Sequence, residues 1–338
     1  MILHTSLKIL LVIMVCLTVS VLSAVAEKPP QVQWQKICER VKNVSYPPAD
    51  QPTVRNAKAL KDCNSYNLYY GFYEEADPEK ARLCAFGEMK DLGDSPFYGK
   101  AMLMTIYANG VGAKRNLDLA LKLACEVEGA PAEVEGRVQH LAELKAKNWQ
   151  GSDFSLCDDI TSGYMQGFCA DHADRFAEAK RNEKLGDIQA KWTKADIKEF
   201  AVLSKIANQY FDVRADQEVD QTGTGRAAFT IGELAAQKDF FLKTLEELER
   251  GALPPYSARQ FKDADASLNT VYQKIQKKTE LEWGSVTKGG IKATQRAWLK
   301  YRDAWIKFCS KKYPGVSSER INTHLTLKRV KELEEFAE

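Results

Sequence analysis

The sequence has few of the residues, and none of the motifs, on which most enzymes depend. Histidine occurs only four times in 338 residues, and His140, His172 and His324 have no obvious nucleophile beside them. No G-x-S-x-G elbow, H-E-x-x-H pair or phosphate-binding loop is present, and the carboxylates are scattered at the spacing of solvated helix faces. We therefore expect a protein that is not an enzyme and holds no cofactor.

Strand patterns and an excess of charge are missing too. No segment alternates apolar and polar residues strongly, which predicts an all-α fold. The formal net charge is only +2, and lysines and acids are interspersed along the helical segments. The sequence therefore gives no electrostatic reason to expect a nucleic-acid partner or a stripe that binds membranes.

The first 26 residues have the pattern of a secretory signal peptide. Lys8 precedes an apolar run over residues 9–22, and Ala24-Val25-Ala26 provides a small-x-small cleavage site. The run is shorter than the roughly 18 residues that a membrane span needs, which argues against a retained anchor. Cleavage after Ala26 would leave 312 residues that are periplasmic or secreted, with no membrane segment.

Export to an oxidising compartment makes the remaining cysteines disulfide candidates. Cys16 leaves with the signal peptide, so seven of the eight cysteines remain, and one must stay unpaired. A Cys63–Cys84 bridge would cross one helical hairpin, but Cys38–Cys63 together with Cys84–Cys125 is an open alternative. We expect Cys309 to react with alkylating agents without reductant.

Cys157, Cys169 and His172 have donor atoms that suit zinc, with Asp171 and Asp174 nearby. A structural zinc site normally has four ligands in tight pairs, and that pattern is absent here. We therefore predict a Cys157–Cys169 disulfide, protected from alkylation until reductant is added, and no metal site.

Residues 56–144 are helical in pattern and repeat with a period of 39 residues. The period places Gly71 on Gly110 and Ala81 on Ala120, as in stacked helical hairpins. The second copy, residues 101–125, is similar to a Sel-one-like repeat, a relative of tetratricopeptide units. We predict a repeat domain over residues 27–148, which either offers a surface to a protein partner or only stabilises the chain.

Residues 263–309 predict a helical hairpin with an aromatic seam, because apolar residues recur at three- and four-residue spacing on both sides of a glycine-bearing loop. Asp265, Asn269, Gln295 and Arg302 lie on or beside these apolar stripes. A buried arginine needs partners, so we expect the four side chains to form a hydrogen-bond network that locks the hairpin. The apolar residues are Leu268, Val271, Tyr272 and Ile275, then Ile291, Trp298, Tyr301, Trp305 and Phe308.

The same stretch resembles the bacterial LprI-type lysozyme inhibitor family. The resemblance covers about residues 157–338, interrupted by an insertion at about 175–255, and it implies that Cys157 and Cys169 are the family's opening cysteine pair. Ile306 departs from the pattern, since members tend to carry cysteine there and this chain has Cys309 instead. The motif residues are Asp265, Leu268, Asn269 and Tyr272 in D-x-x-L-N-x-x-Y, and Gln295, Trp298, Leu299, Tyr301, Arg302 and Asp303 in Q-x-x-W-L-x-Y-R-D.

The resemblance implies a helical domain over residues 149–338 and an envelope protein that binds lysozyme or another cell-wall hydrolase without catalysis. Lys288, in the loop over residues 283–290, is a candidate contact for the carboxylates of a lysozyme cleft. The alternative is an envelope adaptor, whose helical repeats bind another protein while the C-terminal part serves as a platform.

Overall fold

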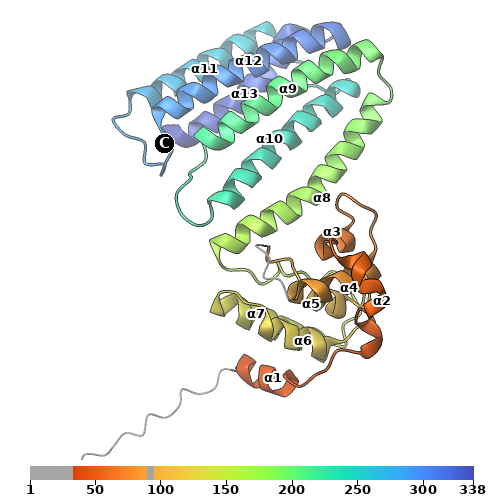
Figure 1. The fold of residues 1–338 in the computed structure, drawn as a ribbon. Helices are drawn as coiled ribbons and strands as arrows, with labels where there is room; N and C mark the ends of the chain where they lie inside the picture. Colours follow the sequence, from red (N-terminus) through yellow and green to blue (C-terminus); the bar gives the residue numbers. More distant parts are fainter. Residues whose placement is uncertain (1–32, 90–94) are drawn as a thin grey trace, which may run out of the picture.

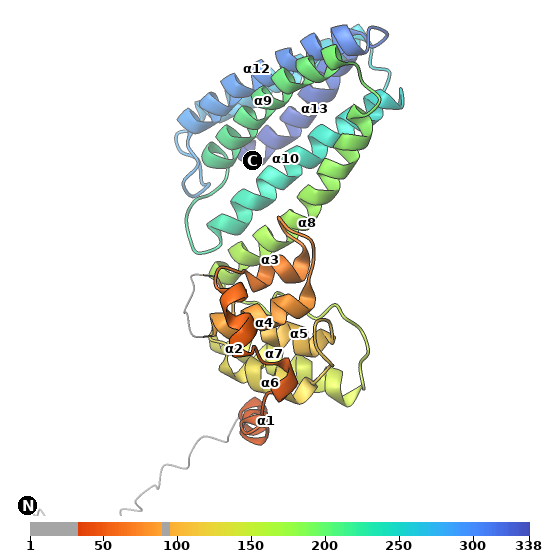
Figure 2. The ribbon, with the colours of Figure 1, turned by 45° about the vertical axis from the view of Figure 1, so that its right-hand side comes forward.

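The computed structural model describes residues 33–89 and 95–338, and all regular structure in these ranges is helical, as predicted. Figure 1 shows a unit of short helices, drawn in red to yellow, and a bundle of long helices, drawn in green to blue. Helix α8 begins in the first unit and runs into the bundle, as the turned view in Figure 2 also shows. The predicted signal peptide lies outside the described residues, and no helix within them is long and apolar enough to cross a membrane.

Among the described residues, the N-terminal unit contains seven α-helices and two short 3-10 helices, and the bundle contains six α-helices. The N-terminal helices are α1 (Gln33–Val41), α2 (Val54–Ala57), α3 (Ser65–Tyr70), α4 (Pro78–Glu88), α5 (Lys100–Asn109), α6 (Leu117–Glu126) and α7 (Pro131–Ala146), with 3-10 turns at Pro48–Asp50 and Lys58–Leu60. The bundle helices are α8 (Gly163–Gln189), α9 (Lys194–Gln217), α10 (Arg226–Glu249), α11 (Ala258–Lys277), α12 (Lys288–Lys312) and α13 (Ser318–Ala337).

The 39-residue period is present in the structure as two helical hairpins, α3–α4 and α5–α6. Gly71 and Gly110 end the first helix of each hairpin with φ of +74° and +67°, a left-handed conformation that favours glycine. Asp77 and Asn116 cap the second helix of each hairpin through their side chains. The repeated alanines have no exposed surface, so the helices approach closely at Ala81, Ala85, Ala120 and Ala124.

Three disulfides link segments of this unit. Cys38–Cys125 joins α1 to α6, Cys63–Cys84 joins the turn before α3 to α4, and Cys157–Cys169 ties the segment before α8 to α8 itself. The alternative scheme of Cys38–Cys63 with Cys84–Cys125 is therefore wrong. A zinc site at Cys157 and Cys169 is also wrong, because the two sulfur atoms are bonded to each other.

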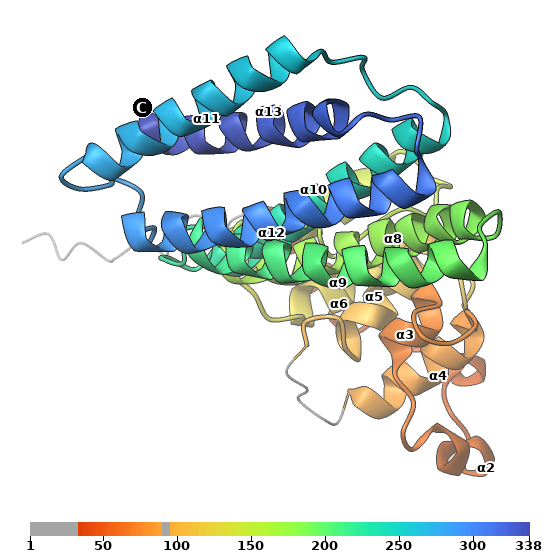
Figure 3. The same cartoon turned by 90° about the horizontal axis from the view of Figure 1, so that it is seen from above.

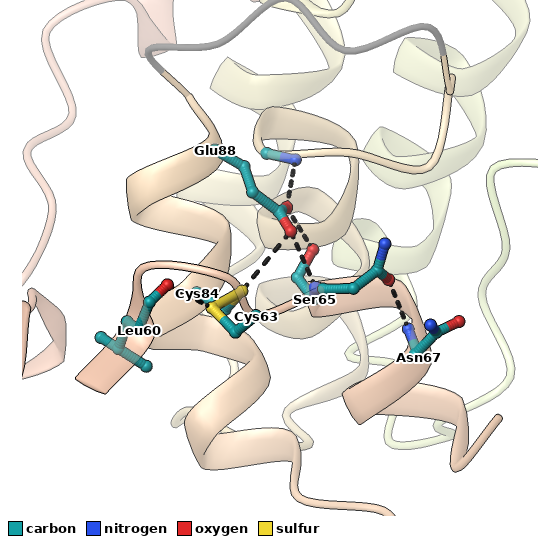
Figure 4. The surroundings of a disulfide bond; sticks show 8 residues. Leu60, Cys63, Ser65, Asn67, Cys84 and Glu88 are labelled. Carbon is teal, nitrogen blue, oxygen red and sulfur yellow. Dashed lines mark hydrogen bonds between the residues drawn. A yellow bond between two sulfur atoms is a disulfide. The ribbon is translucent and has the colours of Figure 1, made fainter. Parts of the chain in front are cut away.

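Glu88, at the end of α4, fixes the beginnings of two other helices beside the Cys63–Cys84 disulfide (Figure 4). Its buried carboxylate accepts hydrogen bonds from the backbone N–H of Ser65 at 2.8 Å and of Gly99 at 3.0 Å. These N–H groups belong to helix starts, which leave such donors without partners inside the helix.

The core of the N-terminal unit does not end at residue 148, where the repeat domain was expected to end. Phe154, Leu156 and Cys169 are buried in the same hydrophobic cluster as α5, α6 and α7. The first turns of α8 therefore belong to this core, and the rest of α8 packs on α10 in the bundle.

The expected α11–α12 hairpin is wrong. Figure 3 shows α11 and α13 side by side, and the main partner of α12 is the antiparallel helix α9. The aromatic seam of α12 is buried as predicted, but it packs on other helices: Tyr301 stacks on Tyr210 at 5.0 Å, and Phe308 packs on Phe200 at 5.8 Å. The aromatic residues of α12 therefore pack on α9, where packing on α11 was expected.

Candidate functional site

The four polar residues expected to lock a hairpin do not form one network. Asn269 donates to the Asp265 carboxylate at 3.2 Å, on the exposed face of α11. Arg302 donates to Asp303 at 3.0 Å, and its guanidinium lies 5.4 Å from the centre of the Trp298 ring. The prediction is wrong because the exposed pair on α11 and the half-buried Arg302 on α12 each find their partners within their own helix.

Gln295 joins a different, buried cluster of charged residues. Its side-chain oxygen accepts a hydrogen bond of 2.9 Å from Arg329 Nε. Arg329 is fully buried and donates to both carboxylate oxygens of Glu218, at 2.7 and 2.5 Å, and to Glu332 at 3.3 Å. Arg214 donates to Glu218 at 2.5 Å, so the cluster connects helices α9, α12 and α13.

The cluster extends to α10 and is fully paired. Arg214 also donates to Glu233 at 2.5 Å, and Gln237 donates to Glu332 at 2.9 Å. Burial by itself raises the pKa of Glu332, but the charges of Arg214 and Arg329 outweigh it and lower that pKa to about 2. With every carboxylate engaged by a cation, the cluster has a structural role, and within residues 33–89 and 95–338 no group of His, Cys, Asp and Glu is placed to hold a metal.

Sequence reasoning missed most of this cluster, although a local signal existed. Arg214 lies four residues after Tyr210 on the apolar stripe of α9, and Glu218 follows another four residues later. That spacing places the three side chains on one buried helix face. The partner Arg329 is 111 residues from Glu218 and could not be assigned to it from local spacing.

The other motif residues divide between core and surface. Leu268, Trp298 and Tyr301 are buried, and Tyr272 is half-buried. Lys288 is half-buried, and its ammonium group donates to the Lys278 carbonyl at 2.7 Å, at the end of α11. Its contact with a partner stays a prediction.

The outward face of α12 carries four exposed cations and the exposed acid Asp303. Lys292, Arg296, Lys300 and Lys307 are exposed, and their spacing of four, four and seven residues places them on one side of the helix. No described residue forms an ion pair with any of them. Leu299 lies on the same side with 38% of its surface exposed.

A shallow groove of about 310 Å³ runs between this face and α9. Leu203 and Phe308 form its apolar floor. Lys300, Asp303 and Lys307 line its α12 side, and Glu199, which pairs with Lys311, lines the α9 side. Val202, 47% exposed, stands on the α9 side. An apolar centre with a charged edge is the usual composition of a protein-binding surface.

Residues 255–333 match the family model described as Lysozyme inhibitor LprI. The match spans α11, α12 and most of α13, and it contains all the motif residues named above for α11 and α12. Cys157 and Cys169, which the resemblance was expected to include, lie before it. No curated protein and no solved structure matches the chain. The likeness of residues 101–125 to Sel-one-like repeats stays a prediction.

Proposed function

We propose that this protein is a lysozyme-inhibitor-like protein of the bacterial envelope, secreted or periplasmic. It binds lysozyme or another cell-wall hydrolase and inhibits it without catalysis. The observation that carries the proposal is the LprI match, which takes in the whole of α11 and α12. Three disulfides support an oxidising compartment, as does the leader-like sequence at residues 1–26.

The outward face of α12 is the surface that we assign to the partner. Glycoside hydrolases generally work through a pair of carboxylates. Lys300 and Lys307 border the apolar groove and carry the opposite charge, and the two acids that also line it, Glu199 and Asp303, already pair with Lys311 and Arg302. Leu299 and Val202 offer apolar contact beside them. Complementary charge of this kind gives specificity and speeds association.

The test uses the full mature chain, because α12 packs on α9, which lies outside the matched segment. At micromolar concentration the protein should slow the clearing of a cell-wall suspension by lysozyme. The double variant Lys300→Glu/Lys307→Glu should inhibit less, since it sets negative charges against the catalytic carboxylates. Inhibition by the unchanged protein should also weaken in high salt.

The matched control is Lys262→Glu/Lys331→Glu, which makes the same charge change at exposed positions on α11 and α13. It should inhibit as well as the unchanged protein. A clearing rate unaffected by the unchanged protein would refute the inhibitor function. Equal loss in both double variants would refute the assignment to α12.

A further inference from the structure

A second hollow, of about 510 Å³, lies in the N-terminal unit. Its walls are residues 95–101, the turn between α6 and α7 at residues 126–130, and the segment over residues 156–165 that leads into α8. The volume is within the range of about 300–1,000 Å³ that is usual for ligand pockets. No residue of the family-matched segment lines this groove.

Buried side chains of α7 hold the walls in place. Arg137 donates to the carbonyl oxygens of Ala124, at 3.0 Å, and Val127, which satisfies the C-terminal end of α6. Glu133 accepts hydrogen bonds from the backbone N–H groups of Thr161 at 2.9 Å and Ser162 at 2.7 Å. These bonds hold two of the three walls in place, which lowers the entropic cost of binding.

One wall of the groove is apolar and reaches solvent. Leu156 is buried at its base, Ile160 and Met165 are half-buried, and Tyr164 has 61% of its surface exposed. A tyrosine in such a position offers a large apolar contact area at a small cost in side-chain entropy.

The charges around the groove are mainly negative. Five carboxylates and two cations line it, namely Glu88, Glu126, Glu128, Glu133 and Asp159 with Lys100 and Arg137.

Most of these charges already have partners, and Glu128 is the exception. Lys100 pairs with Glu126 at 3.0 Å, and Arg137 is buried beneath the surface. Glu128 is exposed, and nothing in the part of the chain that the structure describes forms an ion pair with it. The groove thus presents an unpaired negative charge beside an apolar wall.

We infer that this groove binds an extended peptide segment of a protein partner, in which a lysine or arginine is flanked by apolar residues. The cation pairs with Glu128, and the apolar neighbours pack on Tyr164 and the wall behind it. The net negative lining disfavours an acidic segment, because like charges repel. This gives the adaptor hypothesis a defined surface, and it does not depend on lysozyme binding.

The test measures fluorescence anisotropy of a labelled peptide of alternating leucine and lysine, titrated with the full mature protein. Saturable binding is expected, and a peptide with glutamate in place of lysine should bind at least about tenfold more weakly. Glu128→Lys should weaken binding of the leucine–lysine peptide about fivefold, the upper range for an exposed charge pair. Tyr164→Ala should weaken it by about as much.

Two control variants match these changes at exposed positions outside the groove. Glu75→Lys repeats the charge reversal, and Tyr73→Ala repeats the aromatic truncation. Both should bind the leucine–lysine peptide with unchanged affinity.

The inference is overturned if the leucine–glutamate peptide binds equally well, or if Glu128→Lys and Tyr164→Ala behave like their controls. Analytical ultracentrifugation addresses a different occupant. If the unchanged protein is a dimer and the Tyr164→Ala variant is a monomer, the groove holds a second copy of this chain, and the peptide proposal is overturned. Loss of lysozyme inhibition in Lys300→Glu/Lys307→Glu would leave peptide binding intact, so the two proposals fail separately.

Discussion

The N-terminal unit and the bundle are held together by different means. The N-terminal helices have 4 to 16 residues, and three disulfides link their segments. The bundle helices have 20 to 27 residues, and the only cysteine after Cys169 is the free Cys309. Long helices bury enough aromatic surface to enclose a paired charge cluster, whereas short helices depend on covalent links.

The largest loss of stability that we predict is in the N-terminal unit, when the disulfide that closes its longest loop is removed. The double variant Cys38→Ser/Cys125→Ser opens a bridge between residues 87 positions apart. The chain-entropy model gives a loss of about 4 to 5 kcal/mol in the free energy of unfolding. Urea unfolding followed by circular dichroism should show an early transition for this unit, while the bundle transition stays in place. A shift of the bundle transition instead would contradict the comparison.

In the bundle, the corresponding variant is Arg329→Met, which removes a central cation of the buried charge cluster. It leaves Glu218 buried without its main partner, so the free energy of unfolding should fall by about 3 to 5 kcal/mol. The matched control is Arg302→Met, at a half-buried position on α12 whose partner Asp303 is exposed, and it should cost about 1 kcal/mol or less. Equal losses in the two variants would mean that the buried cluster has no special role.

Acid should weaken the bundle through Glu332. Its pKa is lowered from 4.5 to about 2 in the folded protein, so the folded state binds a proton less readily than the unfolded state. The carboxylate therefore contributes stability above about pH 4.5, and this contribution disappears as the pH falls towards 2. Thermal unfolding between these values should show a falling midpoint, and Glu332→Gln should flatten the profile. An equally steep profile in the variant would assign the acid sensitivity to other groups.

The smallest expected effect is at Cys309. Its side chain is buried, and burial raises the pKa of the thiol to about 12, so little thiolate is available at about pH 8. Alkylation should fail in the native protein and take up one label per chain after denaturation without reductant. This corrects the expectation that Cys309 reacts in the native state. Rapid native labelling would show that the bundle opens readily.

The sequence predicted which residues are buried better than which helices touch. Three- and four-residue spacing correctly indicated the buried faces of Leu268, Trp298 and Phe308. It could not show that α12 packs on α9, because hydrophobic spacing identifies a buried face without naming its partner. Arg302 was expected to be buried and is not, whereas the fully buried Arg329 finds its main partner 111 residues away.

The claim that the family-matched helix α12 supplies the binding surface is tested most directly by hydroxyl-radical footprinting of the mature protein, with and without saturating lysozyme. We predict that Leu299 and Val202, which are exposed in the free protein, lose reactivity in the complex. Tyr164, in the N-terminal groove, should keep its reactivity. Protection of Tyr164 with no change at Leu299 and Val202 would contradict this account.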